Sequence, residues 1–288
     1  MGAPPGERDP LRITSRKNPR VRELLRLQTR RGRKKSGRTL LLGEKIVSDA
    51  VAAGLALETL ILRAEPDSDA WRELPAEEVI ALDAALFDEL AEVDSPPPWL
   101  AVVAVPESAV ALPADGPAAV VVACGLQDPG NLGTILRSAW FYGFCGALLT
   151  RGTTDPWSPK VLRAAIGAIL HRPPEFTEDA EAAIARVTAA GLTPLVLDAH
   201  GGRPLGQLAL PRRAALILGE EGQGFAGQSL PADTVRVTIE GGLPGRPRDS
   251  AAGAESLNVA MAFSAAAWAW RASLDAPGGR PVRHHGAD

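Results

Sequence analysis

The feature that most constrains the fold is a series of short apolar runs that alternates with helix-forming segments in the second half of the chain. Ala118–Cys124 is apolar throughout, as expected of a strand that is buried on both faces of a sheet. Further strands are expected at Ala147–Thr150, Leu192–Leu197, Ala214–Leu218 and Thr234–Ile239. Alternation of this kind predicts an α/β domain built on a parallel sheet.

Helix boundaries in this half follow from capping residues. Ser158 followed by Pro159 is a favourable N-cap and first-turn pair, and it predicts one helix to about Leu170. Other helices are expected over about Leu132–Tyr142, Asp179–Ala190, which Gly191 closes, and Ser256–Leu274.

The first half predicts a smaller α/β domain. Its expected strands are Thr39–Gly43, Leu57–Leu62, Glu78–Leu82 and Leu100–Val105, with helices at Glu44–Ala53 and Asp83–Val93. Pro106–Pro117 contains three prolines and is expected to be the interdomain linker. The predicted layout is a disordered start at 1–10, a first domain at 11–105, a linker at 106–117, a second domain at 118–275 and a disordered tail at 276–288.

Charge is distributed unevenly along the chain. The whole chain carries −3, but residues 8–38 hold thirteen Lys or Arg and two acids, so this segment is +11 and the rest is −14. A basic arm on an acidic body is typical of a protein that docks on a polyanion such as RNA. Val21, Leu24, Leu25 and Leu27 predict an amphipathic helix in the arm, and residues 30–35 are expected to follow it as a loop. The alternative is a solvated tail without a nucleic-acid role. The candidate RNA-binding residues are Arg16, Lys17, Arg20, Arg30, Arg31, Arg33, Lys34 and Lys35.

Several classes of protein are not expected. The apolar stretches are too short for a transmembrane helix, and the polar, Arg-rich N-terminus lacks the apolar core of a secretory signal. We therefore expect a cytoplasmic protein. Cys124 and Cys145 each lie in an apolar run, so we expect buried free thiols and no metal site.

Three unusual loops come after or near the predicted strands of the second domain. The first is Gln127–Thr134, in which Pro and Gly force a turn and Asn131 lies near a helix start. The second is Leu218–Phe225, in which three glycines let a ligand approach the backbone closely. The third is Gly253–Val259, where small polar residues open the last helix. Because ligands bind at the carboxyl ends of strands in open α/β sheets, the three loops predict one shared site.

Each loop also has a simpler interpretation. The first and third could be ordinary capped helix starts. The second could belong to a dinucleotide site, but its spacing is G-x-x-G-x-G instead of G-x-G-x-x-G and it does not follow the first strand.

Taken together and in this order, the loops resemble the three signature motifs of the SpoU/TrmH family of RNA 2′-O-ribose methyltransferases, in the SPOUT superfamily. Asp128–Ala139 is similar to motif one, Leu218–Gly224 to motif two and Glu255–Ala260 to motif three. The first domain resembles the family's ribosomal-protein-like RNA-binding domain more loosely. The resemblance implies an α/β SPOUT domain with a trefoil knot, S-adenosylmethionine as cofactor, RNA as partner and a homodimer.

The resemblance also assigns roles to residues. Asn131 and Arg137 would be the motif-one catalytic pair, Glu221 the motif-two acid, and Ser256 and Asn258 the polar residues of motif three. The cofactor would be held by Leu218, Gly219, Gly224, Val237, Ile239 and Leu257. Ribosomal RNA, most specifically 23S rRNA, is the expected substrate. The alternatives are a transfer-RNA 2′-O-methyltransferase and a non-catalytic RNA-binding or ribosome-assembly factor.

The sequence departs from the family pattern near motif three. Glu240–Ala252 is an extra stretch rich in Gly, Pro and Arg, and Thr238 stands where the family commonly has proline. The insertion is interpreted either as a flap over the cofactor or as a phosphate contact through Arg246 and Arg248.

Overall fold

The computed structural model describes residues 9–64, 68–108, 110–199, 201–220, 224–225, 231–243, 246–247 and 256–275. The chain divides into two units, each built around its own sheet. The first unit contains the residues up to Glu107 and also Asp155–His171, and the second contains Ser108–Thr154 and the residues from Arg172 onward. The first unit is therefore assembled from two separate stretches of sequence.

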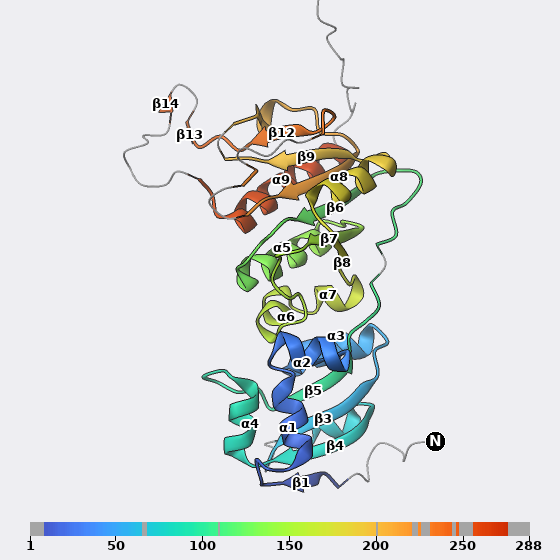
Figure 1. Cartoon of the computed structure of the whole chain (residues 1–288), viewed down its shortest axis with the longest axis vertical. Helices are drawn as coiled ribbons and strands as arrows, with labels where there is room; N and C mark the ends of the chain where they lie inside the picture. The colour runs from blue at the N-terminus through green and yellow to red at the C-terminus, as the bar shows by residue number, and fades with distance from the viewer. Residues whose placement is uncertain are drawn as a thin grey trace, which may run out of the picture. The chain divides into compact units, whose positions relative to one another are not determined.

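The sheet of the first unit is mixed. Its strands are β1 (Leu11–Ile13), β2 (Arg38–Leu42), β3 (Leu57–Arg63), β4 (Ala76–Leu82) and β5 (Trp99–Ala104), in the spatial order β1-β4-β3-β5-β2 (Figure 1). β5 runs antiparallel to both of its neighbours, while β1 and β3 run parallel to β4. The four strands predicted for this half are present, and the short β1 is an addition.

Helices complete the first unit. Its core joins Leu24 of α1 (Pro19–Arg26) and Phe87 of α4 (Ala84–Ala91) to Ile80 and Val102 of the sheet. The helices are α1 (Pro19–Arg26), α2 (Arg30–Ser36), α3 (Glu44–Ala52), the 3-10 turn η1 (Ala70–Glu73), α4 (Ala84–Ala91), α6 (Pro159–Ala165) and α7 (Ala168–His171).

Residues 30–35, predicted as a loop, form helix α2. Thr29 caps its start, because its side chain accepts a hydrogen bond from the Gly32 N–H at 3.1 Å. Gly37 ends it in the left-handed conformation, with φ 68°. Gly32 is not a loop signal here, since a Cβ atom at that position would lie 1.9 Å from the Arg26 carbonyl oxygen. Close packing against the end of α1 requires glycine inside this helix.

The single helix predicted from Ser158 to about Leu170 is also corrected. Ser158 caps the start as expected, with its side chain accepting from the Val161 N–H. The helix stops at Ala165, because Ile166 and Gly167 both adopt positive φ, at 44° and 71°. A second short helix, α7, follows the break.

The second unit contains a wholly parallel sheet, as predicted. Its strands are β6 (Ala118–Ala123), β7 (Gly146–Thr150), β8 (Glu175–Thr177), β9 (Thr193–Leu197), β10 (Arg203–Pro204), β11 (Arg213–Leu218) and β12 (Val235–Thr238). Their order is β10-β12-β9-β11-β6-β7-β8, and each described pairing is parallel. β8 and β10 were not predicted.

Three helices pack on this sheet: α5 (Pro129–Phe141), α8 (Ala180–Ala189) and α9 (Val259–Asp275) (Figure 1). α8 buries Ile184 and Val187 against Val122 and Ile217. α5 and α9 pack against each other, and the Ser138 and Ser264 hydroxyls lie 3.0 Å apart. A 3-10 turn, η2 (Leu205–Gln207), follows β10. The expected combination of two α/β domains is confirmed.

Parts of the sequence-based picture lie outside the described residues. Within the insertion at 240–252, β13 (Gly242–Leu243) pairs antiparallel with β14 (Arg246–Pro247), and Arg248 is not described. Residues 221–223, 226–230 and 248–255 are not described either, and the knot stays a prediction. The same holds for disorder at 1–8 and 276–288. Among the helices that the structure describes, none is long and apolar enough to cross a membrane.

Candidate active site

The first two motif loops begin next to each other at one edge of the parallel sheet. They follow β6 and β11, which are neighbouring parallel strands. The Cys124 N–H donates to the Leu218 carbonyl oxygen at 2.8 Å. The side chain of Glu220 lies directly on Gly125, where a Cβ atom would come within 2.6 Å of the Glu220 Cγ. Glycine at position 125 therefore allows the two loops to pack together.

Two buried threonines shape the motif-one turn. The Gly125 N–H donates to the hydroxyl oxygens of Thr150 and Thr153, at 3.2 and 3.1 Å. The Thr153 hydroxyl in turn donates to the Ala123 carbonyl oxygen at 3.1 Å. Neither threonine was predicted as a site residue, because both lie more than twenty positions after Gly125 in the sequence.

Helix α5 starts at Pro129, three residues earlier than predicted. Asp128 is its N-cap, and its carboxylate accepts from the Asn131 N–H at 2.7 Å. Asn131 therefore lies in the first turn of the helix, beside the cap that fixes the start of α5.

Motif three meets motif one through two asparagines. The Asn258 Nδ2 donates to the Asn131 Oδ1 at 3.0 Å, although the residues are 127 positions apart. The Asn258 Oδ1 also accepts from the Ala260 N–H at 2.9 Å and so caps α9. Two of the five predicted catalytic residues are thus in direct contact, and Asn258 has both a capping and a bridging role.

The other predicted catalytic residues are less constrained. Arg137 is exposed on α5, and its side chain forms no hydrogen bond or ion pair with another residue that the structure describes. Ser256 is exposed just before α9. Glu221 lies outside the described residues.

Leu218, Gly219 and Gly224 of the predicted cofactor set belong to the motif-two loop, whereas Val237 and Ile239 lie in and after β12 and Leu257 lies just before α9. Leu218 and Val237 are each 1% exposed, so they would offer backbone groups. Gly219 packs on Gly224, whose backbone carbon would lie 2.7 Å from a Cβ atom at position 219. Ile239 is partly buried and Leu257 is exposed. Glycine at positions 219 and 224 removes two side chains from this turn, which is compatible with the close approach of a ligand such as S-adenosylmethionine to the backbone.

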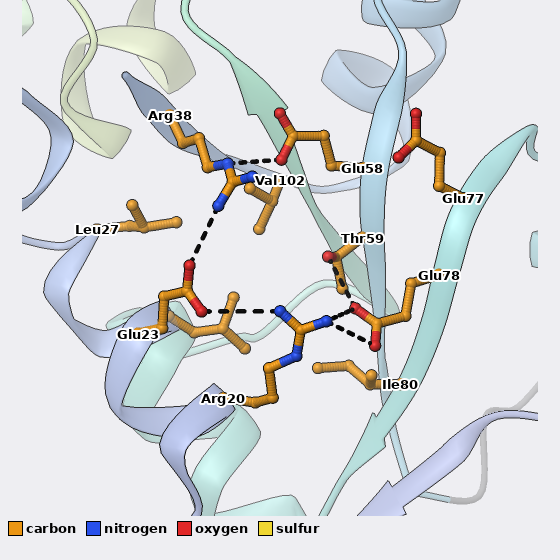
Figure 2. A pocket seen from close by; sticks show the side chains of 11 residues that line it. Arg20, Glu23, Leu27, Arg38, Glu58, Thr59, Glu77, Glu78, Ile80 and Val102 are labelled. Atoms are coloured by element: carbon orange, nitrogen blue, oxygen red, sulfur yellow. Dashed lines mark hydrogen bonds and ion pairs between the residues drawn. The ribbon is translucent and has the colours of Figure 1, made fainter. Parts of the chain in front are cut away.

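Two of the predicted RNA-binding arginines, Arg20 in α1 and Arg16 before it, are already paired with carboxylates. The Arg20 Nη2 lies 2.8 Å from Glu78, and the Arg16 Nη2 lies 2.6 Å from Glu89. Figure 2 shows Arg20 and Arg38 pointing at glutamates around a pocket of about 390 Å³. Its lining includes two arginines and four glutamates: Arg20, Arg38, Glu23, Glu58, Glu77 and Glu78. This net negative pocket is unsuited to a phosphate.

Arg33 is a structural residue. Its side chain is 5% exposed, its guanidinium lies 2.6 Å from Asp155, and it donates to the carbonyl oxygens of Leu27 and Gln28 at 2.7 and 2.9 Å. Because this charge faces the interior of the first unit, we remove Arg33 from the RNA-binding set.

Helix α2 carries a group of exposed cations. Its four exposed basic residues form no ion pair with a described residue: Arg30, Arg31, Lys34 and Lys35. Lys17 is exposed as well, and its carbonyl oxygen accepts from Arg22 at 2.7 Å. Among the described residues, no three His, Cys, Asp or Glu side chains are grouped as a metal site requires.

Fold and site together define the class of the protein, an S-adenosylmethionine-dependent RNA 2′-O-ribose methyltransferase. Residues 118–268 match the SpoU rRNA Methylase family, and residues 18–101 match the MRM3-like substrate binding domain. The chain belongs to the SpoU rRNA methylase family. The resemblance inferred from the three motifs is thereby confirmed.

Individual relatives extend over both units. The chain is 31% identical to the 23S rRNA (uridine(2479)-2′-O)-methyltransferase of Streptomyces viridochromogenes, over 90% of this chain and 92% of that protein. It is 28% identical to the 23S rRNA (guanosine(2553)-2′-O)-methyltransferase RlmP of Bacillus subtilis, over 87% and 95%. The crystal structure of the SpoU methyltransferase AviRb from Streptomyces viridochromogenes in complex with AdoMet superposes with a TM-score of 0.77, at 25% identity over 91% of this chain and 100% of that one.

Proposed function

We propose that this chain transfers the methyl group of S-adenosylmethionine to a ribose 2′-hydroxyl of 23S ribosomal RNA. The observation that carries the proposal is the hydrogen bond between Asn131 and Asn258, at 3.0 Å, beside the packed loops of motifs one and two. It joins polar side chains of two motifs next to a loop suited to the cofactor. Relatives named as 23S rRNA 2′-O-methyltransferases cover most of the chain, which supports ribosomal RNA as the substrate.

The chemistry requires the 2′-oxygen to lie in line with the methyl group and to lose its proton. S-adenosylmethionine supplies an electrophilic methyl group on a sulfonium sulfur. A guanidinium stays protonated in proteins and is therefore a poor base. We therefore assign Arg137 to hold the adjacent phosphate and stabilise the developing alkoxide. Asn131, whose amide Asn258 holds in place, would orient the hydroxyl.

Arg137→Ala and Asn131→Ala test this assignment. Each is expected to lower the turnover number by about 10²–10³, as loss of one stabilising donor does, while the dissociation constant of S-adenosylmethionine changes less than about twofold. Radiolabelled methyl transfer and calorimetry measure the two quantities. Arg271→Ala is the control, since Arg271 is exposed and pairs within α9 with Asp275. Near-normal turnover of Arg137→Ala on its RNA would exclude this role.

We also propose that the enzyme is a homodimer that uses the exposed apolar side chains of α9 and the end of α5. Phe141 is 79% exposed, Trp268 62% and Met261 57%. Met261, Ala265, Trp268 and Ala272 follow helical spacing along one stripe of α9. A second copy related by a two-fold axis would cover this stripe with the same stripe.

Trp268→Glu is expected to convert the dimer to a monomer, because it places a charge in the centre of the apolar stripe. Sedimentation equilibrium measures the mass. Phe176→Glu changes another exposed aromatic residue, on β8 (47% exposed), and should leave the mass unchanged. A monomeric wild-type protein would rule out the dimer but not the methyltransferase.

The specific nucleotide is best found by mapping. We expect a strain that lacks this chain to lose 2′-O-methylation at one position of 23S rRNA. Loss from a transfer RNA instead would support the alternative substrate class, and a wild-type chain that does not bind S-adenosylmethionine would support a non-catalytic role.

A further inference from the structure

An ion pair next to the motif-two loop joins two strands of the sheet. Arg236 is on β12, and Asp198 directly follows the neighbouring strand β9. The Arg236 Nη1 lies 2.5 Å from the Asp198 Oδ2, and the Asp198 side chain is 11% exposed. The Asp198 N–H donates to the Val237 carbonyl oxygen at 2.9 Å. The pair therefore fixes β9 and β12 at the edge of the sheet where the loops emerge.

The same guanidinium reaches the motif-two loop. The Arg236 Nη2 lies 3.5 Å from the carbonyl oxygen of Phe225, a long hydrogen bond. Phe225 is 2% exposed, and its ring packs in the core with Ile184, Val196 and Ile217. This residue comes directly after Gly224, so Arg236 contacts the backbone where the loop returns to the body of the unit.

Two glycines join the two ends of the loop and form its neck. Gly219 packs on the Gly224 backbone, and the Gly224 N–H donates to the Glu220 carbonyl oxygen at 2.8 Å. Gly224 has φ 53°, a left-handed conformation. Because Phe225 directly follows Gly224, the contacts that hold Phe225 also fix the position of this neck.

We propose that Asp198 and Arg236 are positioning residues that place the described ends of the motif-two loop, Gly219–Glu220 and Gly224–Phe225, for binding of S-adenosylmethionine. This inference rests on the proposed function. The planar guanidinium donates to the carboxylate and the carbonyl at once, in a fixed fork geometry that an ammonium group does not have. Arg236 also immediately precedes Val237, one of the predicted cofactor residues, so a shift of Arg236 moves both sides of the cofactor pocket.

Calorimetric titration of the full-length chain with S-adenosylmethionine and S-adenosylhomocysteine tests the inference. Arg236→Met and Asp198→Asn are each expected to raise the dissociation constant about 10–100-fold, by analogy with groups that orient metal ligands. The double variant should be little worse than either single one, because both remove the same interaction. Arg236→Lys should recover only part of the affinity.

Steady-state kinetics separates positioning from catalysis. The KM for S-adenosylmethionine should rise in these variants, while kcat at saturating cofactor stays within about threefold of wild type. A comparable loss of kcat with unchanged cofactor affinity would contradict the assignment.

Arg186→Met is the matched control. Arg186 forms a similarly half-buried ion pair with Glu175 in the same unit, with side chains 34% and 27% exposed against 36% and 11% for Arg236 and Asp198. It joins α8 to β8, away from the motif loops. Arg186→Met is expected to lower Tm without changing the dissociation constant, and all variants are compared well below their melting temperatures.

The outcomes are distinguishable. If wild type and Arg236→Met bind S-adenosylmethionine with equal affinity, the inference is overturned but the proposed function is not. The same holds if Arg186→Met loses as much affinity as Arg236→Met, because the loss would then reflect general instability. A wild-type chain that binds neither ligand would overturn the proposed function and the inference with it.

Discussion

Arg33 and Lys34 are adjacent, carry the same charge and belong to the same helix, yet they have opposite environments. Arg33 is buried against Asp155 and two carbonyl oxygens, while Lys34 is exposed. Burial of this charged group is tolerated because each of the three guanidinium nitrogens donates to an acceptor. In this basic segment, side-chain direction and not charge decides whether a residue stabilises the fold or faces solvent.

Arg33→Met is expected to lower the free energy of unfolding by about 3–5 kcal/mol, because it leaves Asp155 with a largely buried, unpaired carboxylate. Urea denaturation followed by circular dichroism measures the change. Lys34→Met, one residue away, should change the free energy by less than about 0.5 kcal/mol. Similar small effects for both variants would mean that the Arg33–Asp155 pair contributes little to stability.

At the level of elements, the long strands could be predicted from sequence and several short elements could not. β6 and β11 are continuous apolar runs, so burial on both faces identifies them. β8 has only three residues and none of them is buried, so no apolar pattern indicates a strand there. α2 has no apolar periodicity and contains a glycine, and its helical state depends on the Thr29 cap and on packing against Arg26.

The candidate site was predicted in part, for a physical reason. The sequence signals lie in loops with glycine, proline and asparagine, which need special backbone geometry and are therefore visible locally. The Asn131–Asn258 contact brings two such signals together. Asp198 and Arg236 give no local signal, because their role arises from pairing between strands, and the two residues are 38 positions apart.

The Glu175–Arg186 ion pair is expected to make the free energy of unfolding fall at acid pH. The pKa of Glu175 lies below its ordinary value of 4.5, chiefly because Arg186 donates hydrogen bonds to its carboxylate, although partial burial opposes this. A carboxylate with a lowered pKa in the folded state stabilises the fold above pH 4.5, and this contribution is lost as the pH falls through the lowered pKa.

We expect wild type to be more stable than Glu175→Gln at pH 7, and the difference to shrink as the pH is lowered from about 5 toward 3. Urea denaturation across this pH range measures it. Glu178→Gln, at a side chain that is 68% exposed, should show a much smaller effect. A difference that stays constant with pH would exclude this carboxylate as a source of acid sensitivity.

At the scale of the whole molecule, the strongly basic segment provides less free charge than its composition suggests. Arg16, Arg20, Arg33 and Arg38 are paired with acids of the first unit. The unpaired cations of α2 are therefore the best candidates for binding phosphates.

Substituting Arg30, Arg31, Lys34 and Lys35 together with Gln should reduce the slope of log affinity against log salt concentration by about 0.7–0.9 for each phosphate that the helix no longer neutralises. Filter binding of a 23S rRNA fragment over a range of KCl concentrations measures the slope. The matched control is Arg16→Gln with Arg20→Gln, which removes two cations that already have partners and should change the slope less. An unchanged slope in the α2 variant would place the RNA-binding surface elsewhere.

Because the first unit includes Asp155–His171, its folding is tied to the order in which the chain is made. When synthesis has reached Glu107, Arg33 still lacks its carboxylate and the Thr39 hydroxyl lacks the Trp157 carbonyl oxygen that it meets at 2.7 Å. The first unit is therefore completed only after β6 and β7 of the second unit have been synthesised. For the same reason, the first unit cannot be transferred to another protein as residues 1–107 alone, because Arg33 would then be buried without Asp155. An exchange of the two units between relatives would have to move residues 155–171 together with the first unit.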